Sequence, residues 1–498
     1  MDLPFQIPSR PNLPFRGVEN NEKAFRPLNH ELREIRCVTL LPGSRDDPVA
    51  CELVYTSIKN DLDTHIDYTA LSYCWGNVKD TMEIILHGSS MNQSSRTRKE
   101  QNNASFRITR NLYIALKALR NDRRQHLWID AICINQQNLQ EKTHQVQLMA
   151  KIYSSAESVL VWLGPHDLDS QFLMRVWTTH LKSLNGTSPG KDDPKTKIDG
   201  LHRAWWSSAH PLWTDVAQDK VFNQIELEHA GEPMGDCSPS KWSVRIHESL
   251  KKVLERPWWS RIWVVQEVFL APKKGECDRQ VDFRIGDDTL RWQEMVDLIN
   301  LVSDVVFRSD DKIGTPGTPD ISQTFVSRRR SLILEDRLSL KETILPGTDD
   351  SYESAISPWR SPTSQNQLNL NDVKIPITPD LYRTIVNPWR TLISADQRNM
   401  EKDIMSLLTI TSGFHASDPR DKLFALLQLA TDTRQAMRYD PRLSPDYTKS
   451  TWAVFNDLKL WKSDLGRWGD ARLRIDGLFD EHLNPSREWN TQERIPFC

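Results

Sequence analysis

Short runs of apolar, β-branched and aromatic residues alternate with polar turns in the first part of the chain. The runs IRCVTLL (35–41) and VACELVYTSI (49–58) predict two strands that pair as a hairpin, because a Pro-Gly turn follows the first and the second alternates. YTALSYCWG (68–76) and MEIILHG (82–88) predict two further strands, rich in strand-forming residues. The polar block 89–105 has almost no apolar residue and predicts a solvated insertion.

The period of the pattern then changes from two to 3.6. Five apolar positions have the spacing of one helix face, and Thr109 is placed to cap that helix: Ile108, Leu112, Ala115, Leu116 and Leu119. LWIDAICIN (127–135) returns to strand character and places Asp130 in the middle of a strand. A second helical pattern, ending near Ala156, leads to the strand SVLVWLG (158–164).

The order of these elements indicates the fold class. Residues 68–164 give strand, strand, helix, strand, helix, strand, and the strands are short and almost entirely apolar. Helices between such strands require right-handed crossovers and a parallel sheet that is covered on both faces. We therefore predict an α/β fold with a parallel sheet flanked by helices, to which the N-terminal hairpin is added.

Beyond Pro165 the pattern is mainly helical. One helix is expected after Asp167, and residues 240–271 predict two helices divided near Pro257, which suits the first turn of the second helix. VDFRI (281–285) predicts a strand, and a turn at 286–288 leads into a further helix.

Helical periodicity resumes at about Leu381 and predicts a mainly helical C-terminal region. In SDPRDKLFALLQLA (417–430), Asp418 is expected to cap a helix, with Pro419 at its first position and Asp421 at its third.

The chain divides into five predicted segments. The parts that lack periodicity are expected to be loops, linkers or poorly ordered ends, among them a loop at 184–200 and the Pro/Ser/Thr-rich stretch 308–378. The segments are an arm (1–30), a main domain (31–305, core 68–271), a linker or insertion (306–380), a helical region (381–462) and a weakly ordered tail (463–498).

Composition and charge narrow the function classes. The 498 residues carry a formal net charge of −3, so bulk electrostatics predicts no nucleic-acid partner. No apolar run approaches the roughly 18–20 residues that span a bilayer, and the N-terminus lacks the pattern of a secretory signal. We expect a protein without membrane partners in the cytoplasm. The 18 tryptophans recur in short apolar segments such as PWWSRIW (257–263), which predicts bulky cores.

Cysteines and histidines give no sign of a metal site or a disulfide framework. The seven cysteines form no Cys-x-x-Cys pair and fit a reducing compartment, where free cysteine is a small apolar core residue. The 13 histidines are dispersed, and no G-x-x-x-x-G-K-[ST] phosphate loop is present. We therefore predict neither metal nor cofactor.

Three blocks, in this order, resemble one family, the fungal heterokaryon incompatibility (HET) domain. They are YTALSYCWGN (68–77), the stretch that begins LWIDAICINQQNLQEKTHQVQLMAKIY (127–153) and continues to Pro165, and ERPWWSRIWVVQEVFLA (255–271). DPRDKLFALLQLA (418–430) and PDYTKSTWAVFNDL (445–458) resemble the helical segment that often follows. The resemblance covers roughly residues 35–305, with weaker support to about 461.

The resemblance implies an intracellular fungal protein that acts in non-self recognition and regulated cell death. It also implies a fold distantly similar to Toll/interleukin-receptor (TIR) domains, which are flavodoxin-like. Such domains act as effectors that are triggered by association, so the implied partner is a second copy of the chain or another HET or sensor protein.

Asp130 and Cys133 are the first candidates for chemistry, because ligand sites lie beyond the carboxyl ends of parallel strands. Asp130 is either a buried anchor, with Arg261 as a possible partner to test, or a site residue. Cys133 is interpreted as a core residue, because nothing brings a base to it.

Glu141 opens a predicted helix and is either an acid favoured by the helix dipole or part of a crevice with Asn135 and Gln136. Some TIR domains cleave the glycosidic bond of NAD with a helical glutamate, and here a rough alignment places Tyr153 at that position. This departure from the TIR pattern counts against cleavage of NAD by the mechanism of TIR domains.

Tyr73 and Gly76 form a strand-to-loop corner, which is either packing or a place where a ligand approaches the backbone. The alternative to association is therefore an enzyme that cleaves NAD or a similar nucleotide, with Glu141 and Asp130 catalytic and Tyr73, Gly76, Asn135 and Gln136 binding the ligand.

Overall fold

A computed structural model describes most of the chain in nine pieces: residues 25–44, 46–58, 66–87, 103–178, 239–275, 278–299, 379–398, 400 and 402–464. All of them belong to one compact unit, Met1–Ser303 with Pro376–Cys498. The second unit, Asp304–Ile375, lies outside the described residues. Most of the predicted arm (1–30) and of the predicted insertion at 89–105 also lie outside the described residues. The loop at 184–200, the stretch 308–378 and the tail from residue 465 lie outside them entirely.

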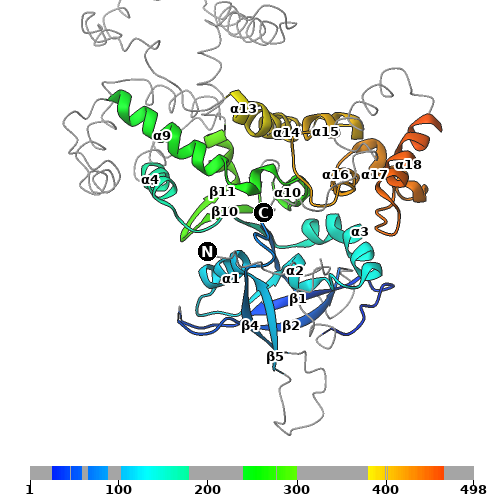
Figure 1. The fold of residues 1–498 in the computed structure, drawn as a ribbon, viewed down its shortest axis with the longest axis horizontal. Coiled ribbons are helices and arrows are strands. Elements are labelled where there is room, and N and C mark those ends of the chain that lie inside the picture. Colours follow the sequence, from blue (N-terminus) through cyan, green and yellow to red (C-terminus); the bar gives the residue numbers. More distant parts are fainter. Residues whose placement is uncertain are drawn as a thin grey trace, which may run out of the picture. The chain divides into compact units, whose positions relative to one another are not determined.

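A mixed nine-stranded sheet forms the centre of the described unit (Figure 1). Its strand order is β11-β10-β7-β3-β6-β1-β2-β4-β5. The strands are β1 (Glu34–Leu40), β2 (Ala50–Ser57), β3 (Thr69–Tyr73), β4 (Thr81–His87), β5 (Asn103–Thr109), β6 (Gln125–Trp128), β7 (Ser158–Trp162), β10 (Val281–Ile285) and β11 (Asp288–Arg291). A separate two-stranded ribbon pairs β8 (Lys273–Lys274) with β9 (Asp278–Arg279).

The predicted parallel sheet is confirmed for four strands. β6, β3, β7 and β10 are parallel neighbours, with Tyr73 opposite Trp162 and Val161 opposite Phe283. The predicted hairpin of β1 and β2 is also confirmed, and β1 joins the sheet antiparallel to β6. The expectation that all strands between 68 and 164 neighbour one another in a parallel sheet is wrong for β4. This strand lies apart from them, parallel to β2 and antiparallel to β5.

The segment 103–109 is a strand where an insertion and then a helix were expected. Phe106 and Ile108 are buried while Ser105 and Arg107 are exposed, so the local period is two. The helix α1 (Arg110–Leu119) therefore starts after Ile108. Its predicted N-cap is confirmed, since Thr109 Oγ1 accepts a hydrogen bond of 3.4 Å from the amide of Leu112.

The strand predicted at 127–135 is wrong beyond Trp128. β6 ends there, and Asp130–Cys133 form a short helical turn, α2. Asp130 is thus the first residue of this turn. A short apolar run does not distinguish a strand from a buried helical turn, which explains the error.

The remaining helices of the main domain follow the predicted order. α3 (Leu139–Ser155) precedes β7, and α4 (Leu168–Val176) follows Asp167 as expected, with Asp167 as its N-cap. The predicted pair at 240–271 is α9 (Pro239–Leu254) and α10 (Trp263–Phe269), but Pro257 opens a separate 3-10 turn, η3 (Pro257–Ser260). Where a helix was expected directly after residue 288, β11 comes first and residues 292–299 are helical.

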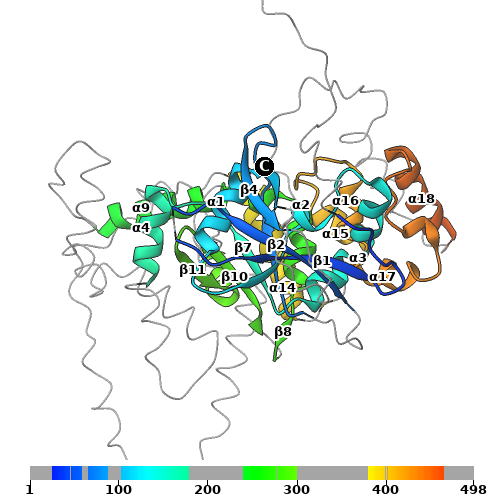
Figure 2. The ribbon, with the colours of Figure 1, turned by 90° about the horizontal axis from the view of Figure 1, so that it is seen from below.

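The C-terminal region is helical, as predicted, and its helices α16 and α17 lie near α3 in both views (Figures 1 and 2). It comprises α13 (Pro379–Leu381), the π-helical turn η4 (Tyr382–Val386), α14 (Asn387–Gln397), α15 (Ile404–Ile410), α16 (Asp421–Phe424), α17 (Thr431–Ala436), the 3-10 turn η5 (Pro441–Leu443) and α18 (Thr451–Asp464). The predicted cap at Asp418 is wrong by two residues, because α16 begins at Asp421 with Arg420 as its N-cap. The Asp418 carboxylate instead accepts from the backbone amide and the guanidinium of Arg420.

An aromatic core joins the sheet to the C-terminal region. Trp258, Trp259 and Trp389 are each 1% exposed, and Phe283 of β10 packs against the first two. Stacked and edge-on ring pairs of this kind stabilise by about 0.5–1.5 kcal/mol beyond the buried area. The prediction that Trp258 and Trp259 are core residues is confirmed.

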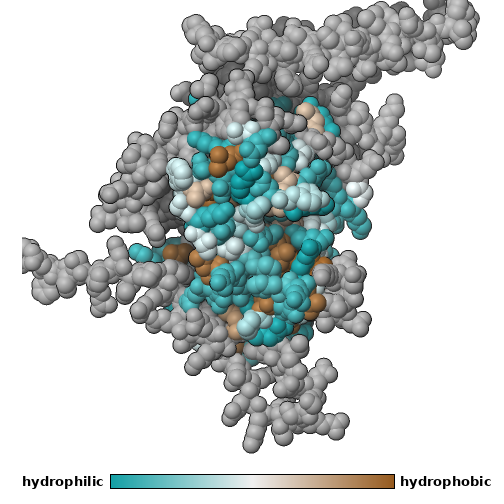
Figure 3. Space-filling model, turned by 90° about the vertical axis from the view of Figure 1, so that its right-hand side faces the viewer, coloured by the Kyte–Doolittle hydropathy of each residue, from teal (hydrophilic) through white to brown (hydrophobic). Residues whose placement is uncertain are grey.

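The described surface that faces the right-hand side of Figure 1 is mostly hydrophilic, with small, separate hydrophobic spots (Figure 3). Among the described helices, none is long and apolar enough to cross a membrane.

Candidate functional site

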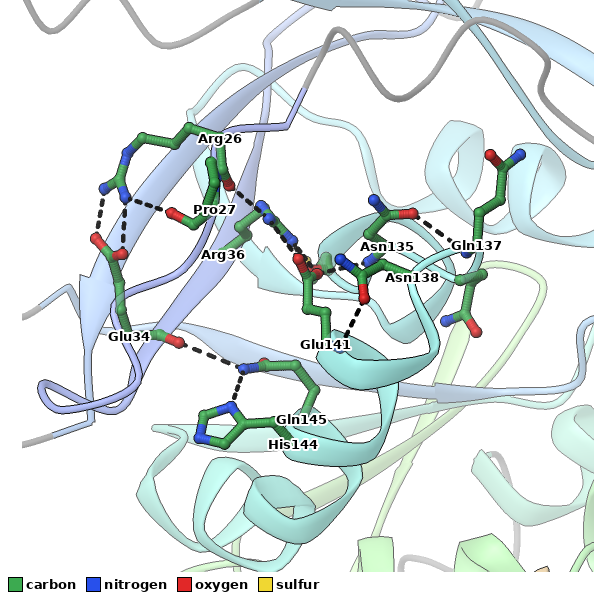
Figure 4. Close-up of polar contacts among 12 residues, drawn as sticks. Arg26, Pro27, Glu34, Arg36, Asn135, Gln137, Asn138, Glu141, His144 and Gln145 are labelled. Carbon is green, nitrogen blue, oxygen red and sulfur yellow. Dashed lines mark hydrogen bonds and ion pairs between the residues drawn. The ribbon is translucent and has the colours of Figure 1, made fainter. Parts of the chain in front are cut away.

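The start of α3 holds the first group of candidate residues, around Glu141 (Figure 4). Asn138 caps the helix, since its Oδ1 accepts a hydrogen bond of 3.0 Å from the Glu141 amide. The Glu141 side chain is buried and meets the guanidinium of Arg36, with Nη1–Oε1 at 2.5 Å and Nη2–Oε2 at 3.0 Å. The amide of Asn135 donates to the same Oε1 at 2.8 Å. Both carboxylate oxygens are therefore occupied from within the fold.

Arg36 reaches Glu141 from β1 and also contacts two further segments, the turn α2 and residues 25–26. Its guanidinium donates to the carbonyl oxygens of Cys133, at 3.2 Å, and Arg26, at 2.7 Å. The ring of Phe25 lies 4.6 Å from its Cζ. Burial lowers the pKa of Arg36, but the hydrogen bonds and charge of Glu141 outweigh it, and the net pKa is raised. The pair has the geometry of a structural anchor for the loop 134–138.

Asn135 and Gln136 lie in that loop and face different partners. Asn135 Oδ1 accepts from the Gln137 amide at 3.2 Å. Gln136 Nε2 donates to the carbonyl oxygen of Asp130 at 2.9 Å. The loop thus connects Glu141 to α2: the backbone amide of Asn135 bonds Glu141, and the side chain of Gln136 bonds the backbone of α2.

Asp130 belongs to a second group, which lies where β3 and β6 end. Its Oδ2 accepts from Trp75 Nε1 at 2.9 Å, and its Oδ1 accepts from the Ala131 amide at 2.7 Å. Burial raises the pKa of Asp130, while the charge of Arg261 and these hydrogen bonds oppose the rise. The predicted partner Arg261 therefore acts on Asp130 through its charge, and its Nη1 donates to the carbonyl oxygen of Tyr73.

Glu267 of α10 completes this second group, and the sequence did not identify it as a site residue. It is 2% exposed, and Ser72 Oγ donates a hydrogen bond to its Oε2. Ser72 Oγ in turn accepts from Trp258 Nε1 at 2.8 Å. Burial raises the pKa of Glu267 to about 7, although the charge of Arg261 and the bond from Ser72 lower it. Glu267 can therefore hold or release a proton near neutral pH.

Two buried tyrosines adjoin these carboxyl groups. Burial and the neighbouring Asp130 charge raise the pKa of Tyr73. Tyr153 donates to the carbonyl oxygen of Leu71 at 3.3 Å, and burial followed by the charge of Glu267 raises its pKa. Tyr153, which the alignment placed at the TIR glutamate position, thus lies within electrostatic reach of Glu267.

We call Ser72, Tyr73, Asp130, Arg261 and Glu267 the strand-end cluster. β3 and β6 are parallel neighbours, so their carboxyl ends meet at one edge, where ligand sites of α/β sheets occur. The cluster combines a carboxyl group with a pKa near 7, a second carboxyl group and a fixed cation. This set can donate a proton and stabilise charge of either sign.

Gly76 and Cys133 have structural explanations. Gly76 has φ +75°, a conformation that favours glycine, and a Cβ there would lie 3.2 Å from Cβ of Asn111. Cys133 is buried, its Sγ accepts from the Ile129 amide at 3.3 Å, and burial raises its pKa to about 12. Such a thiol is not a nucleophile near neutral pH.

The structure thus separates the predicted site residues into two groups. Glu141 and Asn135 lie together at Arg36, whereas Tyr73 and Asp130 lie in the strand-end cluster. The only sequence signal for Glu267 was a glutamate within the apolar run WVVQEVF (263–269). Among the described residues, no group of three histidine, cysteine, aspartate or glutamate side chains could hold a metal ion.

Comparisons with known proteins define the class of this α/β domain. Residues 68–267, which span β3 to α10 and include every member of the strand-end cluster, match the family model of the heterokaryon incompatibility protein (HET). This part of the chain is therefore similar to the HET domain.

A curated relative agrees with this similarity. Heterokaryon incompatibility protein 6, OR allele, of Neurospora crassa is 32% identical over 252 residues, which are 49% of this chain and 33% of the relative. The match thus spans about a third of the relative's length, and it supports a fungal origin for this chain. No solved structure matches the chain.

Proposed function

We propose that the chain acts in heterokaryon incompatibility, the recognition of non-self between fused hyphae. The observation that carries the proposal is the HET domain at 68–267, together with the similarity to a protein named for heterokaryon incompatibility. The proposed output is regulated cell death, triggered when the domain associates with a second copy or with another HET or sensor protein in the cytoplasm.

The strand order supports a distant relation to TIR domains. The parallel strands β6, β3, β7 and β10 are the second, first, third and fourth of their set along the chain. This order, 2-1-3-4, is that of flavodoxin-like sheets. We propose on this ground that the HET domain of the chain is TIR-like and works as an assembly module.

Inducible expression of the full chain in a filamentous fungus tests the proposed function. We expect growth arrest and cell death, with association of the chain measured by light scattering or co-purification. Arg36→Met breaks a buried ion pair, so it should unfold the domain and abolish cell death. The control Arg124→Met breaks an exposed pair, and cells that express this variant should still die. Normal growth and normal fusion with all tester strains, at equal protein level, would overturn the proposal.

A second candidate function is cleavage of NAD or a similar nucleotide. The observation in its favour is Glu267, a buried acid with a pKa of about 7 beside Asp130 and Arg261. In this reaction the bond from ribose C1′ to the nicotinamide nitrogen breaks, nicotinamide leaves as a neutral molecule, and water supplies the hydroxyl group to C1′ and releases one proton. The ionised form of a carboxyl group with a pKa of about 7 can take up that proton, and Glu267 suits this role better than Glu141, whose oxygens are bonded to Arg36.

Purified full chain and NAD, followed by chromatography, separate the two candidates. Cleavage that Glu267→Gln abolishes, with the fold retained by circular dichroism, would support the enzyme. Glu141→Gln is the comparison variant, and its loss of activity should follow its loss of fold. Cell death with cellular NAD intact would exclude the enzymatic candidate and leave association.

A further inference from the structure

The C-terminal region, residues 379–464, contacts the HET domain at the segment that supplies Arg261 and Glu267 to the strand-end cluster. Its backbone meets η3 and α10 directly. The amide of Ile262 donates to the carbonyl oxygen of His415 at 2.9 Å, and the amide of His415 donates to the carbonyl oxygen of Ser260 at 2.5 Å. These bonds form an isolated parallel bridge between Arg261 and His415. The backbone on both sides of Arg261 is thus fixed by a residue that lies 154 positions further along the chain (415 − 261).

Trp389 of α14 fixes the same segment from the core. Its indole Nε1 donates to the carbonyl oxygen of Trp259 at 2.9 Å. Its ring stacks on Trp258, with centroids 5.4 Å apart, and Trp258 in turn donates to Ser72 of the cluster. A continuous set of contacts therefore runs from α14 to the hydroxyl group that hydrogen-bonds Glu267.

Gln266, next to Glu267 on α10, is 1% exposed and connects three elements. In the amide orientation that satisfies both ends, its nitrogen donates to Ala425 O at 3.1 Å and its oxygen accepts from Ala150 N at 2.9 Å. The C-terminal region, α10 and α3 thus meet at the residue before Glu267.

A second row of contacts attaches the same region to α3. Gln147 Nε2 donates to Ser444 Oγ at 3.0 Å and to the carbonyl oxygen of Pro445 at 2.8 Å. The ring of Tyr447 lies 4.9 Å from Lys142 Nζ of α3, and its hydroxyl donates at 2.5 Å to Asp421 of the C-terminal region itself. Lys142, Gln147 and Ser444 are partly exposed, so their contacts can form and separate at lower cost than a buried apolar interface.

We infer that residues 379–464 form an intramolecular clamp whose docking on η3, α10 and α3 positions Arg261 and Glu267 in the strand-end cluster. The family match ends at residue 267, so the clamp lies wholly outside the segment that defines the domain. Arg261, Gln266 and Glu267 sit within seven residues, and the clamp holds this short stretch by backbone and side-chain bonds. Release of the clamp frees that stretch and disassembles the cluster, whatever the cluster's activity. His415 and Trp389 are positioning residues in this scheme.

Hydrogen exchange of the full chain, read by mass spectrometry, tests the clamp. His415→Pro removes the amide that bonds Ser260, and Trp389→Phe removes the bond to Trp259 but keeps an aromatic ring. In either variant, amides of 258–269 should exchange roughly tenfold faster, since about 1.4 kcal/mol of local stability corresponds to a factor of ten. Amides of β6 and β1, which take no part in the clamp contacts described above, should keep their rates.

A matched control comes from the same region. Trp452 of α18 is 60% exposed, and Trp452→Ala should leave the exchange of 258–269 unchanged. Unchanged exchange at 258–269 in both clamp variants would overturn the clamp, and so would a uniform rise over the whole chain, which indicates general destabilisation. Gln147→Ala removes the bonds to Ser444 and Pro445, and it should raise amide exchange at 139–150 more than in β6, by less than tenfold. Because exchange is measured without any activity, failure of the clamp is distinguishable from failure of the proposed function.

Discussion

Glu141 and Glu267 are two buried glutamates of the same domain, 6% and 2% exposed, yet their surroundings differ in kind. Glu141 meets the guanidinium of Arg36 with two charge-assisted hydrogen bonds. Glu267 receives a hydrogen bond from the neutral hydroxyl of Ser72, and its pKa is raised to about 7. Burial alone therefore does not decide the role of a carboxyl group: the charge of the group it contacts does.

The position of each glutamate in the fold explains the difference. Glu141 faces β1 of the antiparallel hairpin, where an arginine in the middle of the strand points at the start of α3. Glu267 faces the ends of the parallel strands, where Asp130 adds a second negative charge and Arg261 is directed to the Tyr73 carbonyl oxygen. The first arrangement anchors a loop, and the second keeps a proton exchangeable.

The largest expected effect comes from breaking the Glu141 pair. Arg36→Met leaves the Glu141 carboxylate buried without its cation, and removal of one partner of a buried pair costs about 3–5 kcal/mol. Urea unfolding at pH 7, followed by tryptophan fluorescence, should show this loss in the free energy of unfolding.

Two further variants qualify the result. Arg36→Met combined with Glu141→Leu should recover most of the loss, because both charges are then removed. Arg124→Met breaks an exposed pair with Glu52 and should cost less than about 1 kcal/mol. If Arg36→Met were as mild as Arg124→Met, the anchor assigned to Glu141 would be wrong.

Glu267→Gln should change how stability depends on pH. The folded pKa of about 7 lies above the ordinary value of 4.5, so the folded state binds more protons between these values. The free energy of unfolding contributed by this group therefore falls as pH rises from about 4.5 to about 7, by about 3 kcal/mol at most. Glutamine does not titrate, so the variant should lose that slope and be relatively more stable at pH 8 than at pH 5.

Unfolding of both proteins at pH 5, 6, 7 and 8 measures this difference. Parallel curves for wild type and Glu267→Gln would show that Glu267 does not titrate in that range. A guanidinium hydrogen-bonded to Glu267, as Arg36 is to Glu141, would produce that result.

The comparison also shows what the sequence could predict. Most of the strands, the helices α1 and α3 and the N-cap Thr109 follow from local periodicity and capping. The turn α2 was missed because DAIC is as apolar as a strand, and this error placed Asp130 within the sheet. Glu267 was missed because its partner Ser72 lies 195 residues away, and no local pattern reports a contact over that distance.

Ser72→Ala should weaken the strand-end cluster by a moderate amount. The variant removes the donor to Glu267 and the acceptor of Trp258 Nε1, and an unsatisfied buried polar group costs about 1–3 kcal/mol. Since the bond from Ser72 lowers the pKa of Glu267, its loss should also raise that pKa further. Denaturant unfolding at pH 6 and pH 8 checks both effects.

Ser158→Ala is the control in a neighbouring strand of the same sheet. Ser158 Oγ lies 3.2 Å from Thr69 Oγ1 at a partly exposed position, so its loss should cost less and leave the pH dependence unchanged. Equal costs for the two serines, with equal pH profiles, would contradict the link between Ser72 and Glu267.

The smallest expected effect separates the helix cap from the ion pair at Glu141. Asn138→Ala removes the cap of α3 and should cost about 1 kcal/mol, as should Asp403→Ala at the start of α15, where Oδ1 accepts from Ser406 at 2.8 Å. Urea unfolding gives both values.

Asn138 bonds the backbone amide of Glu141, whereas Arg36 bonds its side chain, so the two restrain one residue from both ends. In a double-mutant cycle, Asn138→Ala and Arg36→Met should therefore couple, while Asp403→Ala and Arg36→Met should add. Simple additivity in the first cycle would mean that Arg36 holds Glu141 independently of where α3 begins, and the cap would then play no part in the anchor.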